Sequence, residues 1–344
     1  MGYMRKYTCP YCKTTSSVNR QRKRQQSIVY YCKGCHKYFS IKTTYCNTRQ
    51  ILSDHLDGFS FRKLALRYDI SPMTAWRICE QELKKLPDNN QITLQYCNRF
   101  SHTLVCDGKY FNVASTRYDY CLLWGIDYFT HDIPICIIAP SESYASWSRY
   151  FSYFRIIAQR PELLVCDDNV NLKMAARSIL PQVRIQTCYN HFKENIRRSL
   201  RVRSDEQYRP FMKRIEEIFK VKMNDDAINK KLFMLFRDYH TDPIALSILT
   251  NIQRYMPELT AYRGIPQSPI TTNIIEGLNS HLEARLHPLR SFQSVAYAKL
   301  WMNAYILKRR TTKWTDCTGK FRLLQGKTGL ERTIKQGLDV PTFF

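Results

Sequence analysis

Short apolar runs, each ended by a polar residue, dominate the middle of the chain. The run at 163–166 stops on Asp167, and a segment with helical periodicity follows it as far as Pro181. A short apolar run ended by a carboxylate is typical of a buried strand. The tetrapeptide Leu-Val-Cys-Asp occurs at 104–107 and again at 164–167. Two such strands lying side by side bring Asp107 and Asp167 to one edge of a sheet, where carboxylate oxygens are suited to hold Mg²⁺.

More strands are predicted on the N-terminal side of this segment. The pattern indicates strands at 103–107, 118–127 and 133–139, followed by a helix at 144–158 that is aromatic on one side. Three antiparallel strands, a helix and then a parallel strand begin an α/β fold with a ribonuclease-H-like mixed sheet. The turn signals at 86–90 predict a linker in front of this sheet.

The C-terminal half has mainly helical patterns. Residues 201–266 look all-helical, a helix carrying Glu276 begins near Thr271 or Thr272, and another helix is expected at 292–310. We therefore expect an all-helical insertion that divides the sheet-forming core. The expected segments are a core in two parts at 98–200 and 267–310, the insertion at 201–266, and a loose basic tail at 311–344.

The net charge indicates the kind of partner. The chain has 53 Lys and Arg against 29 Asp and Glu, a net charge of +24, and residues 1–50 contain no acidic side chain. A protein this basic most often binds a polyanion; the alternative is a basic surface that binds no such partner. Because no apolar run approaches a membrane span and the N-terminus lacks a secretory signal, we expect a cytoplasmic, nucleoid-associated protein with no membrane partner.

Four cysteines near the N-terminus have the spacing of a zinc site. One Cys-x-x-Cys turn is separated from a second by 19 residues, and the four are Cys9, Cys12, Cys32 and Cys35. Four thiolates satisfy a tetrahedral Zn²⁺, so a zinc ribbon is predicted at 1–46, with four unrelated buried cysteines as the alternative. The intervening loop is expected to contact DNA phosphates through a basic run. These side chains are Arg20, Arg22, Lys23 and Arg24.

Residues 47–88 have the pattern of a helix-turn-helix domain. Ser60 and Ser71 are suited to cap two helices, and Pro72 lies in the first turn of the second. One face of that last helix is apolar, with Trp76, Cys79, Leu83 and Leu86. The opposite face is expected to meet the major groove of DNA through Thr74, Arg77, Gln81 and Lys84. A three-helix bundle without DNA contact is the alternative.

The order of these modules resembles prokaryotic insertion-sequence transposases with an Asp-Asp-Glu site, in particular the Mutator-like group. One specific match is the strand ended by Asp167, followed by a helix, Pro181 and the Cys-x-x-His pair Cys188 and His191. The other is the segment at 271–279, Thr-Thr-Asn-Ile-Ile-Glu-Gly-Leu-Asn, which is similar to the helix that bears the last carboxylate in that family. The resemblance covers residues 100–310 well.

The resemblance implies a DDE-type transposase. Asp107, Asp167 and Glu276 would hold two Mg²⁺ or Mn²⁺ ions and catalyse phosphodiester hydrolysis at element ends and transesterification into target DNA. The implied partners are double-stranded DNA, as element ends and target, and further copies of the chain on DNA. Residues expected to support the site are Cys188, His191, Asn273, Asn279 and Arg285. Asp168 remains an alternative to Asp167 as the ligand.

Two other functions remain open from the sequence. The chain could be a domesticated, sequence-specific DNA-binding regulator with an inactive core, in which Asp107 ends a strand, Asp167 caps a helix and Glu276 lies on the surface. It could also be a zinc-dependent hydrolase acting through Cys188 and His191. Two such ligands without a second pair make a weak zinc site, so we favour a packing or hydrogen-bonding role for that pair.

Overall fold

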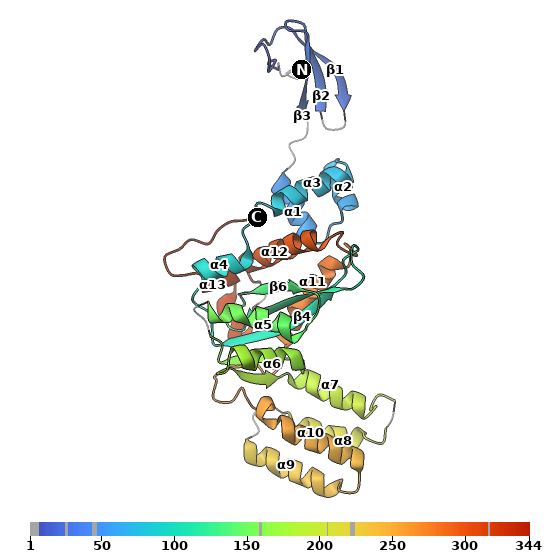
Figure 1. Cartoon of the computed structure of the whole chain (residues 1–344), viewed down its shortest axis with the longest axis vertical. Coiled ribbons are helices and arrows are strands. Elements are labelled where there is room, and N and C mark those ends of the chain that lie inside the picture. Colours follow the sequence, from blue (N-terminus) through green and yellow to red (C-terminus); the bar gives the residue numbers. More distant parts are fainter. Residues whose placement is uncertain are drawn as a thin grey trace. The chain divides into compact units, whose positions relative to one another are not determined.

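The computed structural model describes residues 7–24, 27–42, 47–157, 160–204, 206–220, 224–315 and 317–344, and for Lys23, Arg24 and Lys42 only the backbone. The chain divides into two compact units (Figure 1). One consists of Met1–Leu86 with Ala284–Arg290 and Phe344, and the other of Pro87–Glu283 with Ser291–Phe343. The last residues of the predicted zinc ribbon, 43–46, lie outside the described part.

The N-terminal module is a three-stranded antiparallel sheet. Its strands are β1 (Val18–Arg24), β2 (Ser27–Cys32) and β3 (Lys37–Lys42), in the order β1-β2-β3. The basic run was expected in a loop, and this was wrong, because it forms β1. Arg20 and Arg22 are exposed there, which suits an edge strand, since charged side chains discourage further strand pairing.

Three helices follow, with the predicted caps. They are α1 (Thr48–Leu56), α2 (Phe61–Tyr68) and α3 (Pro72–Leu83). The Ser60 and Ser71 hydroxyls accept the N–H groups of Lys63 and Thr74, which the first helical turn leaves unpaired. Between α2 and α3, Asp69 adopts a left-handed conformation with φ of 49°. The buried face of α3 consists of Ala75, Cys79 and Leu83, so Trp76 is only half-buried, contrary to expectation.

A five-stranded mixed sheet forms the centre of the second unit. Its strands are β4 (Thr103–Phe111), β5 (Tyr120–Asp127), β6 (Cys136–Ala139), β7 (Leu163–Cys166) and β8 (Arg184–Thr187). They lie in the order β6-β5-β4-β7-β8, with β6, β5 and β4 antiparallel and β4, β7 and β8 parallel. This is the predicted ribonuclease-H-like sheet, and the predicted α/β class is confirmed.

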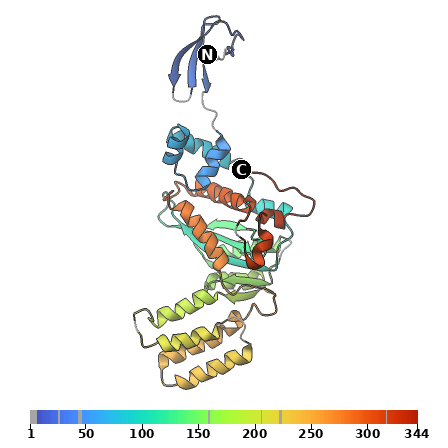
Figure 2. The same ribbon diagram turned by 180° about the vertical axis from the view of Figure 1, so that it is seen from behind.

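Helices cover both faces of this sheet. The helices on one face are α5 (Tyr144–Ser152), with the short η1 (Tyr153–Arg155) after it, and α6 (Val170–Ile179). Those on the other are α11 (Asn273–Leu286) and α12 (Val295–Thr311), seen from behind in Figure 2. Aromatic side chains of α5, including Trp147, Tyr150 and Phe151, pack with Leu104 and Leu164 in one buried cluster. Burial on both faces explains why these strands appear in the sequence as continuous apolar runs.

Two expectations about the ends of this core were wrong. Strand β4 continues past Asp107 to Phe111, because β5 pairs with it along its whole length. The last two residues of the predicted linker already belong to the helix α4 (Asn89–Tyr96), whose first turn Asp88 caps by accepting the N–H of Gln91. Asn90 also bonds to Cys136 in β6 through both its amide groups, so α4 is joined to the edge of the sheet.

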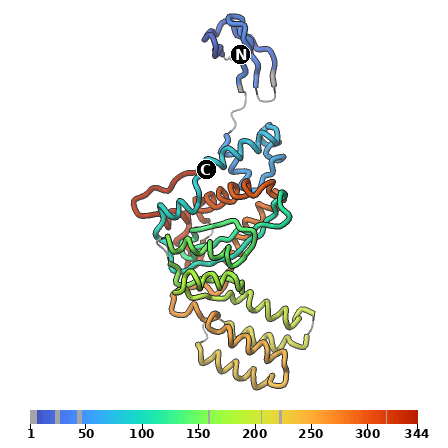
Figure 3. The backbone as a smooth tube through the Cα atoms, in the orientation of Figure 1, coloured from blue at the N-terminus to red at the C-terminus, as the bar shows by residue number. Residues whose placement is uncertain are grey.

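The helical insertion is present between β8 and α11. Its helices are α7 (Tyr189–Ser199), α8 (Arg209–Ile218), α9 (Asp225–Asp238) and α10 (Pro243–Leu259), the yellow-green to orange part of the tube in Figure 3. They share one hydrophobic cluster, which includes Tyr189, Phe192 and Ile196 of α7. The apolar core of the insertion therefore begins before residue 201, where the pattern had placed its start.

The C-terminal segment packs on the core and is not a loose tail. It contains η2 (Gly319–Leu324) and α13 (Gly329–Thr333), with Leu324, Leu330 and Ile334 buried. The Thr333 hydroxyl donates to Asp132 Oδ2 at 2.5 Å, and buried Arg310 donates to both carboxylate oxygens of Asp132. A Cβ on Gly329 would lie 2.9 Å from the backbone oxygen of His131. Glycine at this position therefore permits close packing of the segment on the core.

Within the described residues, no helix is both long enough and apolar enough to cross a membrane.

Candidate active site

Asp107 and Asp167 lie at the same level on neighbouring parallel strands. The register of β4 and β7 pairs Thr103 with Leu163 and Val105 with Val165. Continued for two residues, the same register brings Asp107 level with Asp167, at the point where β7 ends. Side chains at one level of two parallel strands point to the same face of the sheet. The repeated tetrapeptide thus places the two carboxylates next to each other.

The two carboxylates repel each other in a partly buried position. Burial, followed by the charge of Asp167, raises the pKa of Asp107 to about 6. Burial also raises the pKa of Asp167, although the N–H of Asn169 opposes this by donating to Asp167 Oδ1 at 3.2 Å. Groups that are hard to ionise because of burial and like charge are typical of sites that bind cations or substrates.

Asp168 is engaged in a different network. Its Oδ1 lies 2.5 Å from Lys173 Nζ, and its Oδ2 accepts the Tyr255 hydroxyl at 3.0 Å. Lys173 is only 4% exposed and also donates to Glu258 Oε2 at 2.6 Å, which joins α6 to α10 of the insertion. The charge that acts on Asp107 is that of Asp167. The geometry therefore favours Asp167 over Asp168 as the ligand.

The helix α11 contributes Asn279, which contacts Asp107. Asn279 Nδ2 donates to Asp107 Oδ2 at 2.7 Å, and Asn279 Oδ1 accepts Trp124 Nε1 at 3.1 Å. Trp124 is the residue opposite Asp107 on β5, so the amide of Asn279 bridges two strands. Both amide groups of Asn279 are thereby used, which fixes the Asp107 carboxylate against α11.

Glu276 lies one helical turn before Asn279 and contacts the segment after β8. Its Oε1 accepts the Thr272 hydroxyl at 2.5 Å and lies 3.9 Å from His191 Nδ1. The hydrogen bond with Cys188 raises the pKa of His191 to about 9, and the charges of Glu276 and Asp167 add to the shift. His191 also lowers the pKa values of Asp107 and Asp167. One imidazole is therefore close enough to act electrostatically on all three predicted carboxylates.

The remaining predicted support residues have different surroundings. Cys188 is fully buried at the start of α7 and donates its backbone N–H to Cys166 O at 2.8 Å, so it lies beside the end of β7. Asn273 Oδ1 accepts Asn190 Nδ2 at 2.9 Å on an exposed surface. Arg285, in the last turn of α11, is grouped with the first compact unit.

A fourth carboxylate, Glu142, was missed from the sequence. It precedes α5, and Asn169 Nδ2 donates to its Oε2 at 2.7 Å. A Cβ on Gly108 would lie only 2.4 Å from the Glu142 carboxyl carbon. Burial, then the charges of Asp107 and Asp167, raise the pKa of Glu142 to about 7. No motif marks Glu142, and the one signal in the sequence is the glycine after Asp107, which leaves room for its carboxylate.

Without a cation, this cluster is expected to lose stability as the pH rises. The folded-state pKa of Asp107 is about 6 against an ordinary 3.8, so the folded chain holds a proton that the unfolded chain loses near pH 4. The free energy of unfolding therefore falls by about 3 kcal/mol as the pH rises from about 4 through 6. In EDTA, Asp107→Asn should gain most of that amount relative to wild type between pH 4.5 and 7.5 in urea unfolding. Saturating Mg²⁺ should remove the gain.

Asp226→Asn, which changes an exposed residue of α9, serves as the control for this measurement. A difference between Asp107→Asn and wild type that stays constant with pH would contradict the electrostatic account of the cluster.

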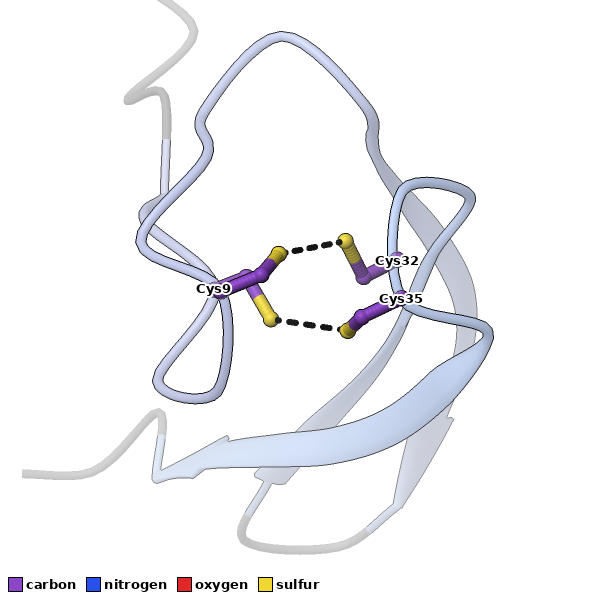
Figure 4. Close-up of side chains that lie close together, drawn as sticks. Cys9, Cys32 and Cys35 are labelled. Carbon is purple, nitrogen blue, oxygen red and sulfur yellow. Dashed lines mark hydrogen bonds between the residues drawn. The ribbon is translucent and has the colours of Figure 1, made fainter.

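The four N-terminal cysteines form a second candidate metal site. The Sγ atoms of Cys9 and Cys35 lie 3.6 Å apart, and those of Cys12 and Cys32 lie 3.5 Å apart. In Figure 4 the labelled side chains point into one space between two turns. A tetrahedron with Zn–S bonds of about 2.3 Å has edges of about 3.8 Å. The thiols therefore fit one zinc ion, and Tyr30 and Phe39 pack against them in a small hydrophobic cluster.

Most of the predicted DNA-contacting side chains are accessible. Arg77 and Gln81 on α3 and Lys84 at its C-cap are exposed, and Thr74 is half-buried with its N–H bonded to Ser71. Arg20 and Arg22 are exposed on β1. The side chains of Lys23 and Arg24, predicted for the same role, lie outside the described part.

The strand order, with acidic side chains where β4 and β7 meet, defines a ribonuclease-H-like fold. The chain belongs to the Mutator family of transposases, because the family model described as "Transposase, Mutator family" matches residues 72–314. The resemblance inferred from the motifs is thus confirmed at the level of the family.

Two curated relatives are transposases for insertion sequence element IS256 in transposon Tn4001, from Staphylococcus aureus and Enterococcus faecalis. Each is 24% identical over 175 residues, which is 50% of this chain and 44% of the relative. The chain therefore spans less than half the length of these relatives. Among solved structures, the HTLV-2 integrase catalytic core domain in complex with magnesium is 16% identical, with a TM-score of 0.21, over 39% of this chain and 84% of that chain. The fold assignment rests on the strand order.

Proposed function

We propose that the chain is a DDE-type transposase of an insertion sequence. It binds the terminal repeats of its element and catalyses metal-dependent strand cleavage and strand transfer at Asp107, Asp167 and Glu276. The observation that carries the proposal is the level placement of Asp107 and Asp167 on parallel strands, with Glu276 3.9 Å from His191, whose charge acts on both aspartates. Asp107 and Asp167, with Glu276 on α11, offer the oxygen ligands that hard divalent cations such as Mg²⁺ or Mn²⁺ prefer.

The side chains of the site have separate tasks in this mechanism. When bound, two divalent ions lower the pKa of an attacking water or 3′-hydroxyl and stabilise the leaving oxygen. Asn279 holds Asp107 Oδ2, the N–H of Gly108 holds Oδ1 at 2.8 Å, and the N–H of Asn169 holds Asp167. These bonds fix the carboxylates before the ions arrive, so little reorganisation is needed. No protein nucleophile takes part.

DNA binding is assigned to the N-terminal modules. The net charge of +24 favours association with a polyanion of any sequence. In this proposal the exposed Arg77 and Gln81 of α3 contact base edges, and the exposed Arg20 and Arg22 of β1 contact phosphates. Two element ends must be brought together for transposition, which implies that more than one copy of the chain binds DNA, at the nucleoid.

Metal-dependent nicking of plasmid DNA tests this function against the alternative of a DNA-binding regulator with an inactive core. The full chain should convert supercoiled plasmid to nicked circles in Mg²⁺ or Mn²⁺ and not in EDTA. A chain that binds DNA tightly but never nicks it in either metal would favour the regulator.

Arg77→Ala is expected to weaken specific binding by about 1–3 kcal/mol and to relax the sequence preference. The probe is a duplex selected from a random library by binding to the wild-type chain, and affinity is measured by fluorescence anisotropy at several salt concentrations. Arg77→Lys is the matched control, because it keeps the charge but loses the planar guanidinium that pairs with guanine. Arg22→Ala should instead weaken all duplexes alike and reduce the salt slope by about 1. If Arg77→Ala left the preference unchanged, α3 would not be the recognition helix.

A further inference from the structure

Thr272 lies at the centre of a small network of buried hydrogen bonds. It immediately precedes α11 and is 1% exposed. Its backbone N–H donates to Cys188 Sγ at 3.3 Å, and its Oγ1 lies 3.1 Å from the same sulfur. The two bonds connect the start of α11 to the start of α7. They are reinforced by the N–H of Tyr189, which donates to Ile270 O at 2.9 Å.

The hydroxyl of Thr272 also reaches the carboxylate. It donates to Glu276 Oε1 at 2.5 Å and lies 3.4 Å from His191 Nδ1. The Glu276 side chain is 42% exposed, so solvent alone would leave it several rotamers. Thr272 has a stiff β-branched side chain in a buried position, and its hydroxyl therefore selects one of these rotamers. The hydrogen bond from Thr272 is accepted by Oε1 of Glu276 and does not involve the other carboxylate oxygen, Oε2.

A soft-metal site on the same side chains is a competing explanation. Ligand atoms of Cys188, His191 and Glu276 lie within 4.8 Å of one another, a grouping that could hold an ion. However, Thr272 Oγ1 already lies between these three groups, at 3.1 Å, 3.4 Å and 2.5 Å. A bound zinc would need its ligands at about 2.0–2.3 Å and would have to displace that hydroxyl. The geometry favours a hydrogen-bonded network over a metal centre.

We propose that Thr272 is a positioning residue for the third metal-binding carboxylate. Its hydroxyl, fixed by Cys188, holds Glu276 Oε1 and presents Oε2 to the ions at Asp107 and Asp167. This assignment rests on the proposed function, since it takes Glu276 as a ligand of those ions. It also gives the Cys-x-x-His pair a task, because Cys188 and His191 surround the hydroxyl that orients the carboxylate. Hydrogen-bond partners of ligating side chains typically change metal affinity or activity by about 10–100-fold.

The test uses the full chain, supercoiled plasmid and Mn²⁺, with nicking rates measured over a range of Mn²⁺ concentrations. Binding of Mn²⁺ is followed separately by electron paramagnetic resonance. Thr272→Val keeps the shape of the side chain and removes the hydroxyl, and it should raise the half-saturating Mn²⁺ concentration by about tenfold or more. Thr272→Ser restores the hydroxyl and should recover most of the affinity. Thr271→Val, at the preceding and half-buried threonine, is the matched control and should match wild type.

The variants also separate positioning from packing. If Thr272→Val unfolds, Thr272→Ala is compared with Thr272→Ser, since both lack the methyl group and only one has the hydroxyl. Equal Mn²⁺ dependence in that pair, or wild-type behaviour of a folded Thr272→Val, overturns the proposal. Failure of the proposed function looks different, because wild type and Asp107→Asn would then bind Mn²⁺ equally and neither would nick the plasmid.

Discussion

Asp107→Asn is expected to lower the rate of metal-dependent DNA nicking by about 10³-fold or more, because it removes one of the charges that hold the ions and stabilise the leaving oxygen. The substitution keeps the shape of the side chain and its place between Gly108 and Asn279. Binding of the chain to DNA should be unchanged, since the substitution lies outside the N-terminal modules. Nicking is measured as the initial rate with supercoiled plasmid in Mn²⁺.

The same variant should be more stable than wild type when no metal is present, because it removes the burial of a charge and the repulsion by Asp167 that together raise the pKa of Asp107. Loss of activity combined with gain of stability is the signature of a functional carboxylate, whereas a structural one would lose both. Asp168→Asn is the informative companion. It should destabilise the chain by breaking the contact with buried Lys173, which then keeps Glu258 as its charged partner but loses a close ion pair. If Asp168→Asn abolished nicking in a folded chain and Asp107→Asn did not, the assignment of the ligands would be wrong.

Removal of zinc is the second change with a large expected effect. The hydrophobic cluster around the four cysteines is small, and its buried members are Cys9, Tyr30, Cys32 and Phe39. Binding of a structural zinc ion contributes about 10–16 kcal/mol to modules of this kind, which are unfolded without it. Replacing Cys9 and Cys12 by Ser should therefore unfold the sheet of β1 to β3 and reduce DNA affinity. The sheet formed by β4 to β8 should stay folded and bind Mn²⁺ as before.

Metal content and hydrogen exchange measure this result. The wild-type chain should contain one zinc ion, and the double variant none, with fast exchange confined to the N-terminal module. Cys317→Ser, which changes a cysteine of the other unit, is the control. Loss of Mn²⁺ binding together with zinc would instead point to a zinc-dependent core and revive the hydrolase hypothesis.

The site was predictable from the sequence where local patterns and the strand register coincide. The repeated tetrapeptide predicted that Asp107 and Asp167 lie together. The apolar runs before the two residues pair in register as parallel strands, so the two side chains lie at the same level of the sheet. The serine caps of α2 and α3 were equally local features. The position at which a strand ends could not be predicted from its apolar run. β4 extends past Asp107 only because β5 continues to pair with it.

Long-range contacts account for the other differences. The segment at 311–344 is basic and rich in glycine, yet Thr333 bonds to Asp132, a residue that also pairs with Arg310 and that no local pattern links to this segment. Glu142 precedes a helix and has no motif, and it joins the acidic cluster only through the fold around Gly108. Thr272 was noted only as the start of a helix, since its partner Cys188 lies far away in the sequence.

Anomalous diffraction from crystals of the full chain grown with Mn²⁺ and a nicked DNA duplex tests the central claim most directly. The account predicts two Mn²⁺ peaks about 4 Å apart, bound by Asp107, Asp167 and Glu276. A single peak on Cys188, His191 and Glu276, with none at the two aspartates, would contradict it.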